Sequence, residues 1–272
     1  TISDAAALNP SSAITISAWL YPTFDPTSIT ANPVSKVGTG IQAYSLEIGP
    51  SVPAGGYVYL DGDTRRIGVY SGDRPPANTW VHMMMTYDST AGPDYANVWL
   101  DGIQKAMNNQ VPGGLGDYDI PSGSGDLFLG GWSASYRGQD WRGRMADVRI
   151  YNTALTSGNA VTLASINPTT EASGTYADAD NALGAVGWWK LNGTASGTLD
   201  MTDSVASNDG AAVGNTKLGF VTVTGSAGFN LSRDAMAHNT QTHFTNTYIS
   251  GSADIIIPVS GTVLTKGTVV LD

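Results

Sequence analysis

The chain has 272 residues, with 13 Lys and Arg against 23 Asp and Glu, so its formal net charge at pH 7 is -10. Such an acidic surface repels phosphate backbones and anionic lipid headgroups, which argues against nucleic acids and membrane surfaces as partners. No apolar run approaches the ~18 residues of a membrane span, and the lack of Cys excludes disulfides, thiolate nucleophiles and structural zinc held by thiolates.

The composition favours strands over helices. Gly occurs 33 times and charged residues make up only 13% of the chain. Turn formers and short β-branched segments therefore dominate over the Ala, Leu, Glu and Lys mixture that builds long helices. The sequence predicts an all-β protein.

The first 155 residues read as a series of strands. Residues 13–21 place Ile14, Ile16, Ala18 and Leu20 on one face, and this alternation of period two predicts a strand with one buried side. Asp-Gly pairs at 61–62 and 101–102 favour tight hairpin turns. Further strands are predicted over residues 44–48, 56–60, 66–70, 80–87, 96–100, 126–130 and 144–151, a spacing typical of a β-sandwich.

The second part of the chain is more polar. Residues 160–166 predict one short helix, and the polar stretch 167–181 predicts a linker or surface excursion. Residues 185–191 are again strand-like, and 229–246 are polar and irregular. Short strands are predicted in a β-rich tail at 218–223, 248–249, 255–259 and 268–271.

Five motifs in order carry a family resemblance. They lie at residues 8–19 (LNP, then ITISAW), 80–88 (WVH, then TYD), 98–102 (VWLDG), 127–130 (LFLG) and 141–155 (WRG, then ADVRIYN and AL). Together they resemble the laminin-G-like jelly roll of the concanavalin A-like lectin/glucanase family. The resemblance implies an antiparallel jelly-roll β-sandwich over residues 1–155, followed by a β-rich C-terminal extension.

The opening strand of that family is displaced in this chain. Sequences that resemble it lie at residues 188–192 (WWKLN), 203–204 (DS) and 208–210 (NDG). A sandwich without an edge strand exposes unpaired backbone groups. Residues 186–215 are therefore expected to fold back onto their own jelly roll, to complete a neighbouring chain, or to begin a second module. The favoured division is a jelly roll (1–155), a helix and linker (156–185), the completing strand segment (186–215) and a small β-rich region (216–272).

Catalysis finds no support in the sequence. Glycosidases need two carboxyl groups across a cleft, and the resemblance implies Glu-x-Asp-x-Glu on one strand in jelly-roll hydrolases. This chain has only two Glu, Glu47 and Glu171, in unrelated segments. His82, His238 and His243 have no evident Ser or Asp partner in the sequence. We therefore predict no catalytic residues and no enzymatic activity.

The resemblance also implies a structural Ca²⁺ near the last strand of the jelly roll. Asp147 occupies the position of the family's carboxylate, and Asn192 would be a second ligand from the displaced opening strand. A carboxylate within a strand needs a countercharge when it is buried. The alternatives are an ion pair of Asp147 with Arg149 or Arg144, or simple exposure to solvent.

A sugar site needs aromatic platforms with polar groups beside them. Trp132, Tyr136, Arg137 and Asp140 lie within ten residues of each other and form the candidate carbohydrate-binding set. The nearby Trp141 matches an aromatic core position of the family. The tryptophans expected mostly in the core are Trp19, Trp80, Trp99, Trp188 and Trp189.

Three functions are compatible with these features. The first is a non-catalytic structural or adhesive protein of an extracellular, cell-surface or virion-surface assembly, of the decoration, appendage or surface-layer type. Its partners would be copies of itself, other surface or virion proteins, or glycans, without nucleic acid or membrane insertion. The second is a lectin-like carbohydrate-binding module. The third is an accessory part of a larger hydrolase.

Overall fold

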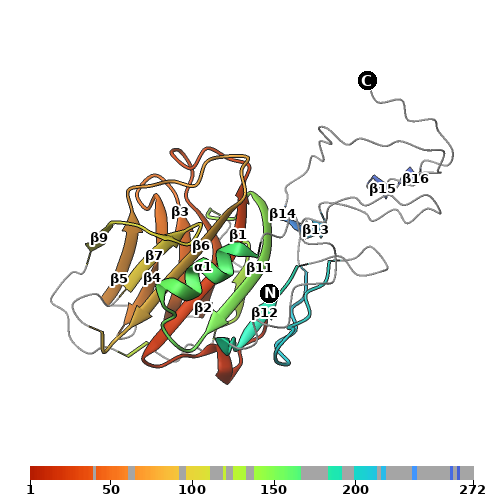
Figure 1. Cartoon of the computed structure of the whole chain (residues 1–272). Coiled ribbons are helices and arrows are strands. Elements are labelled where there is room, and N and C mark those ends of the chain that lie inside the picture. Colours follow the sequence, from red (N-terminus) through yellow and green to blue (C-terminus); the bar gives the residue numbers. More distant parts are fainter. Residues whose placement is uncertain are drawn as a thin grey trace.

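Two antiparallel sheets lie face to face around one hydrophobic core (Figure 1). Most of the apolar side chains of both sheets point into the space between them, which gives the all-β sandwich that the sequence predicts. This computed structural model describes residues 1–38, 41–60, 65–91, 96–110, 119–120, 125–132, 138–166, 183–191, 199–212, 216–218, 235–237, 258–259 and 262–263.

The larger sheet contains β1 (Ala13–Pro22), β6 (Val81–Asp88), β7 (Ala96–Leu100), β8 (Ile103–Gln104), β11 (Gly143–Tyr151), β12 (Gly187–Trp189), β13 (Thr216–Leu218) and β14 (Ala235–Ala237). Its order over the described residues is β13-β14-β11-β1-β6-β7-β8, and β12 also pairs with β11. The central strand β1 pairs antiparallel with both β6 and β11. Its alternate residues Ile14, Ile16, Ala18 and Leu20 are fully buried in the core, as the period-two pattern predicts.

The smaller sheet contains β2 (Ala31–Gly38), β3 (Ile41–Ile48), β4 (Ala54–Leu60), β5 (Arg65–Ser71), β9 (Met107–Gln110) and β10 (Leu127–Leu129). Its order is β10-β2-β3-β4-β5-β9, with antiparallel pairing throughout the described strands. A 3-10 helix, η1 (Ala6–Leu8), precedes β1, and a separate pair joins β15 (Pro258–Val259) to β16 (Thr262–Val263).

Helix α1 (Ser157–Ser165) covers part of the outer side of the larger sheet (Figure 1). Thr156 caps it, because the Thr156 hydroxyl accepts from the backbone of Asn159 while the Asn159 side chain accepts from the backbone of Thr156. Leu163 on its buried side belongs to a second apolar cluster with Met84 and Trp99 of the sheet. The helix begins three residues before the predicted start at 160, because this cap supplies the start signal that apolar periodicity alone does not carry.

Five described strands lie outside the ranges predicted from the sequence: β2, β8, β9, β14 and β16. β2 contains Pro33, which argues against a strand, yet a register shift between Ala31 and Val34 accommodates it. β14 lies inside the stretch 229–246 that was expected to be irregular, and it pairs with β11. The strands predicted at 248–249 and 268–271 lie outside the described residues.

The displaced opening segment lies against the first part of the same chain. β12 pairs antiparallel with β11, with Trp189 opposite Val148. Beyond the strand, Gly210 forms a bridge to Ile2, and the Ala211 amide donates to the Thr1 carbonyl at 2.7 Å. Figure 1 accordingly places the N-terminus next to β12. The division of the chain into four regions remains a prediction.

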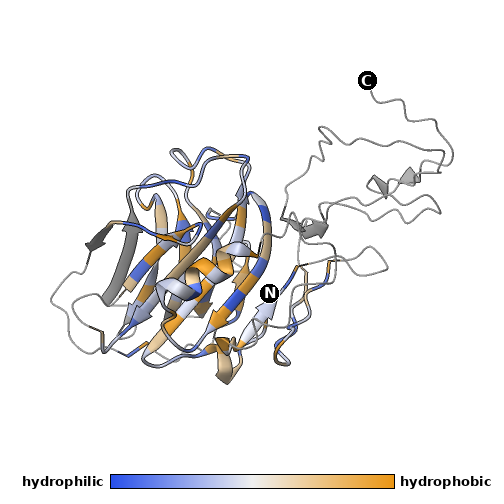
Figure 2. Cartoon of the chain, viewed as in Figure 1, coloured by the Kyte–Doolittle hydropathy of each residue, from blue (hydrophilic) through white to orange (hydrophobic). Residues whose placement is uncertain are grey.

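Figure 2 shows hydrophilic and hydrophobic residues alternating in bands along β11, as expected for a strand with one face in the core. No helix in the described part of the chain is long and apolar enough to cross a membrane.

Candidate functional site

A row of side chains crosses the outer side of the smaller sheet. The strand register pairs Phe128 with Ser35, Ser35 with Ser45, and Ser45 with Tyr57. Directly paired residues project to the same side of a sheet. The residues beside them along each strand belong to the core; Leu127, which precedes Phe128, is one of them. The row therefore projects away from the core.

Three aromatic rings extend this row. The ring centroids of Tyr57 and Tyr59 lie 5.9 Å apart, and those of Tyr59 and Trp132 lie 6.1 Å apart in an edge-to-face arrangement. Tyr57, Trp132 and Phe128 are each half-buried, whereas Tyr59 is almost fully buried beneath its neighbours. We call Phe128, Tyr57, Tyr59 and Trp132, with the serines Ser35 and Ser45 between them, the outer aromatic face.

The loop that carries Trp132 is fastened to β2. The Ser35 hydroxyl lies 2.7 Å from the Gly131 carbonyl oxygen and 2.8 Å from that of Trp132. Gly131 has no side chain, and a Cβ atom there would stand 3.0 Å from Asp140 Oδ1, so Asp140 lies directly against this loop. The backbone amide of Asn32 in β2 also donates to the Gln139 carbonyl at 2.9 Å. These contacts bring Trp132 and Asp140 together beside the smaller sheet.

Two polar atoms near this face lack hydrogen-bond partners among the described residues. They are Ser45 Oγ and Asn32 Oδ1, and both are buried. The Asn32 amide nitrogen is used, because it donates to the Leu46 carbonyl at 3.0 Å. Buried polar atoms are costly when they are left unsatisfied, so an ordered water at these positions would stabilise this arrangement.

The carboxylate of Asp147 lies on the other side of the sandwich, in a bulge of β11. The register between β1 and β11 shifts at Ser17/Trp19, and Asp147 takes a positive φ of 53° there. Its Oδ1 accepts from Arg149 Nε at 2.9 Å and from Trp188 Nε1 at 2.6 Å. Asp147 and Arg149 are both buried, with 1% of each residue exposed. This is the ion pair with Arg149 that the sequence left open as an alternative.

The surroundings of Asp147 do not fit a calcium ion. The Arg149 guanidinium carbon and the Lys190 ammonium lie 4.3 and 4.5 Å from the Trp188 ring centroid. Calcium binds oxygen ligands and favours several carboxylates, whereas the countercharge of this carboxylate is the Arg149 guanidinium, 2.9 Å from Asp147 Oδ1. Within the described ranges, no group of three or more His, Cys, Asp or Glu residues could hold a metal. Asn192, the second predicted ligand, lies outside the described residues.

His82 has a serine partner that was not evident in the sequence. Ser17 Oγ lies 2.8 Å from His82 Nε2, on adjacent strands of the larger sheet. The pair is fully buried, and burial, with a smaller effect of the Arg149 charge, lowers the pKa of His82 to about 3. A histidine this weakly basic is a poor general base at neutral pH, and it has no access to substrate. The expectation that His82 lacks a Ser partner is therefore wrong, although the pair is structural.

A model of the concanavalin A-like lectin/glucanases superfamily matches residues 1–160. The chain belongs to this superfamily. A comparison with curated proteins found no match.

Solved structures that resemble this chain do so at low sequence identity. A heptameric SAP-like pentraxin from Limulus polyphemus is 15% identical, over 58% of this chain and 73% of that chain, with a TM-score of 0.45. A carbohydrate-binding protein from Bacteroides ovatus, so described provisionally, is 15% identical over 75% of this chain and 52% of that chain (TM-score 0.48). A Trypanosoma rangeli sialidase is 18% identical over 56% of this chain and 22% of that chain (TM-score 0.38). The chain thus spans about half of the Bacteroides protein and a fifth of the sialidase.

Within this superfamily fold, the predicted sugar residues divide into two groups. Trp132 and Asp140 lie together beside the smaller sheet, whereas Tyr136 and Arg137 lie outside the described residues. Trp141 is buried and packs edge-to-face on Phe24, as its family position implies. Four of the five other tryptophans expected in the core are buried, namely Trp19, Trp99, Trp188 and Trp189. The fifth, Trp80, is only half-buried.

Sequence reasoning missed Tyr57, Tyr59 and Phe128 as members of the outer aromatic face. The signal was available for the two tyrosines, since residues 56–60 (GYVYL) place both on one side of a strand by their spacing. Their proximity to Trp132 was not visible, because it depends on the pairing of β10 with β2 across more than 90 residues of chain, as between Phe128 and Ser35.

Proposed function

We propose that this chain is a non-catalytic, glycan-binding module that acts as an adhesive part of an extracellular or virion-surface assembly. The observation that carries the proposal is the outer aromatic face, where half-buried rings border a row of serine hydroxyls. Sugar rings offer both apolar C–H faces and hydroxyl groups, so they need ring platforms and hydrogen-bonding groups together.

The polar groups support a neutral glycan as the ligand. The Ser45 hydroxyl lies between Ser35 and Tyr57 in the row but is fully buried, so the half-buried rings supply the accessible contacts of this face. Glu47 follows Ser45 on the same side of β3, and Asp140 borders the Trp132 loop. Carboxylates accept hydrogen bonds from sugar hydroxyls but repel anionic sugars. With the net charge of -10, this favours uncharged glycans.

Binding rather than hydrolysis is the role that the residues support. Glycoside hydrolysis needs a pair of carboxyl groups, one of them with a raised pKa. The chain holds only two Glu, and the buried Ser17–His82 pair is not accessible to a substrate. The adhesive role follows from glycan binding without turnover together with the acidic, cysteine-free composition.

A glycan array followed by calorimetry tests the proposal. We expect Tyr57→Ala and Trp132→Ala to weaken binding to the best glycan by about 5- to 30-fold, since loss of a stacked ring costs on the order of 1–2 kcal/mol. Tyr21→Ala is the matched control, because Tyr21 is also half-buried but lies on β1 of the larger sheet. Equal binding by all variants, or no binding to any glycan, would reject the site. Hydrolysis of a bound glycan that Glu47→Gln abolishes would reject the non-catalytic role.

A further inference from the structure

The chain turns back over the outer side of the smaller sheet directly after β10. The Gly130 amide still donates to the Pro33 carbonyl of β2 at 2.7 Å. Gly130 then takes a φ of 94°, which glycine adopts at little steric cost. The carbonyl oxygens of the next two residues lie at the Ser35 hydroxyl. We call residues 130–132 the Trp132 turn.

One hydroxyl group holds the Trp132 turn against β2. Ser35 projects outward, because it pairs directly with Phe128 and Ser45 of the outer row. Its Oγ lies 2.7 Å from the Gly131 carbonyl oxygen and 2.8 Å from the Trp132 carbonyl oxygen. A serine has a single O–H, so the two carbonyls share one donor. Ser35 is fully buried, so water does not compete for this hydrogen bond.

The Trp132 ring is supported separately by Tyr59. Their ring centroids lie 6.1 Å apart in an edge-to-face arrangement, and Tyr59 is only 4% exposed. Ser35 thus holds the backbone of Trp132 while Tyr59 contacts its ring. Trp132 itself is half-buried, so part of its indole group stays open to solvent in one defined orientation.

Ser45 provides a close comparison with Ser35. The two residues pair directly across β2 and β3, and both are fully buried. Ser45 Oγ, however, has no hydrogen-bond partner among the residues that the structure describes. Removal of the Ser45 hydroxyl therefore breaks no such bond, whereas removal of the Ser35 hydroxyl leaves two buried carbonyls of the Trp132 turn without their donor.

We infer that Ser35 is a positioning residue of the outer aromatic face, which fixes the direction of the Trp132 ring through the backbone of the Trp132 turn. The inference rests on the proposed function, because a ring already held in place loses less conformational freedom when a ligand stacks on it. Ser35 makes no contact with a ligand itself, since its side chain is not accessible.

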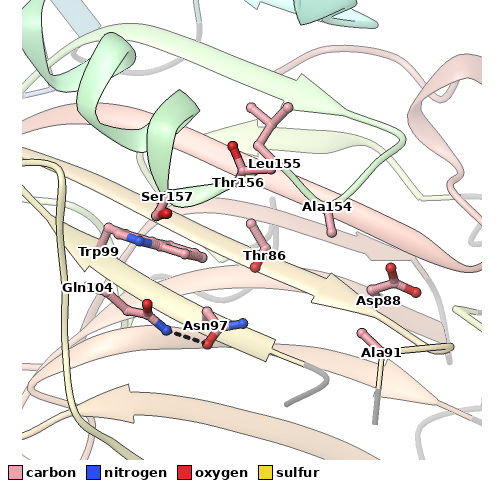
Figure 3. A pocket seen from close by; sticks show the side chains of 10 residues that line it. All are labelled: Thr86, Asp88, Ala91, Asn97, Trp99, Gln104, Ala154, Leu155, Thr156 and Ser157. Atoms are coloured by element: carbon pink, nitrogen blue, oxygen red, sulfur yellow. Dashed lines mark hydrogen bonds between the residues drawn. The ribbon is translucent and has the colours of Figure 1, made fainter.

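Trp99 provides an internal reference on the other side of the sandwich. It lies on the floor of a pocket of about 230 Å³ between the start of α1 and the larger sheet (Figure 3). It is 3% exposed and belongs to the apolar cluster under α1. Its indole group therefore reports on the fold across the core from the Trp132 turn.

Proton–nitrogen spectra of the full chain without ligand test the inference. The chain has seven Trp, and the loss of one indole signal in Trp132→Phe and in Trp99→Phe assigns these two residues. In Ser35→Ala the Trp132 signal should shift, and its proton–nitrogen nuclear Overhauser effect should fall, because the ring gains motion on the ps–ns timescale. In the matched control Ser45→Ala the Trp132 signal should keep both values, and the Trp99 signal should keep them in both variants.

Calorimetry with the best glycan of the array then measures the consequence for binding. Ser35→Ala should weaken binding by about 2- to 10-fold, the range that corresponds to the ordering of one side chain, and Ser45→Ala should bind as the unchanged protein does. An unchanged Trp132 signal in Ser35→Ala, an equal change in Ser45→Ala or at Trp99, or a mobile Trp132 ring with unchanged glycan affinity would overturn the inference. Failure of the unchanged protein to bind any glycan would reject the proposed function and with it the positioning role, even where the Trp132 signal shows that Ser35 holds the turn.

Discussion

Trp189 offers the sharpest test of how the displaced strand completes the sandwich. Its side chain is fully buried, in the same core cluster as the residues of β1. Its Nε1 also donates to the Asn208 carbonyl at 3.0 Å. Replacing a buried Trp by Ala costs about 3–5 kcal/mol, and loss of the hydrogen bond adds about 1 kcal/mol. Trp189→Ala should therefore lower the free energy of unfolding by about 4–6 kcal/mol.

Such a loss is large beside the ~5–15 kcal/mol of a typical domain. In a scan of melting temperature it corresponds to a decrease of roughly 10–20 °C for a core of this size. Guanidinium unfolding followed by tryptophan fluorescence measures the free energy directly. Trp80→Ala is the matched control, because Trp80 is half-buried and contacts Tyr21 where the central strands β1 and β6 meet the end of the larger sheet. Its expected cost is about 1 kcal/mol.

The same measurement distinguishes the chain's own strand from a neighbour's. If β12 completes its own sandwich, the melting temperature and the mass in sedimentation should not depend on protein concentration. Exchange of the strand between chains would make both rise with concentration. A Trp189→Ala variant within 1 kcal/mol of the unchanged protein would refute the reasoning, since a Trp that closes the core cannot be neutral.

Two further predictions concern buried charges. The pKa of His82 is about 6.5 in the unfolded chain but about 3 when the residue is buried in the fold, so only the unfolded state is protonated between these pH values. The free energy of unfolding should therefore fall by about 3 kcal/mol between pH 7 and pH 4. His82→Gln should flatten this pH dependence in acid titrations of unfolding, and an unchanged slope would contradict the prediction. Asp147→Asn should lower the free energy of unfolding by about 3–5 kcal/mol, because it leaves the buried Arg149 charge without its partner. EDTA should leave the melting temperature of the unchanged protein as it is. A melting temperature that EDTA lowers and Ca²⁺ restores would contradict the ion pair as the role of Asp147.

Regular alternation made much of the fold predictable. In β1 the core residues Ile14, Ile16, Ala18 and Leu20 alternate with residues of the other face, so its type and its core face follow from period two, although the other face is buried as well. β2 could not be found in this way, because Pro33 interrupts its pattern. The strand tolerates Pro33 through a bulge between Ala31 and Val34, which appears only in its pairing with β3. Helix α1 was located, but its start depends on the cap at Thr156, which apolar periodicity does not report.

The sites were less predictable, because each one joins distant segments. Ser17 and His82 are 65 residues apart, and no local pattern announces their hydrogen bond. Asp147 was identified by its place in a strand, yet its partners were undecided until the fold placed Trp188 above it. The amide pair Asn97 and Gln104 is local, but it becomes one side of a pocket only when α1 lies over it. Local patterns thus predict elements, while tertiary pairing decides chemistry.

The outer aromatic face lies on the smaller sheet, on one side of the sandwich. One molecule therefore presents this proposed site to one glycan surface, and avidity would come from several copies bound to the same layer. Such multivalent attachment suits adhesion, and it does not require turnover.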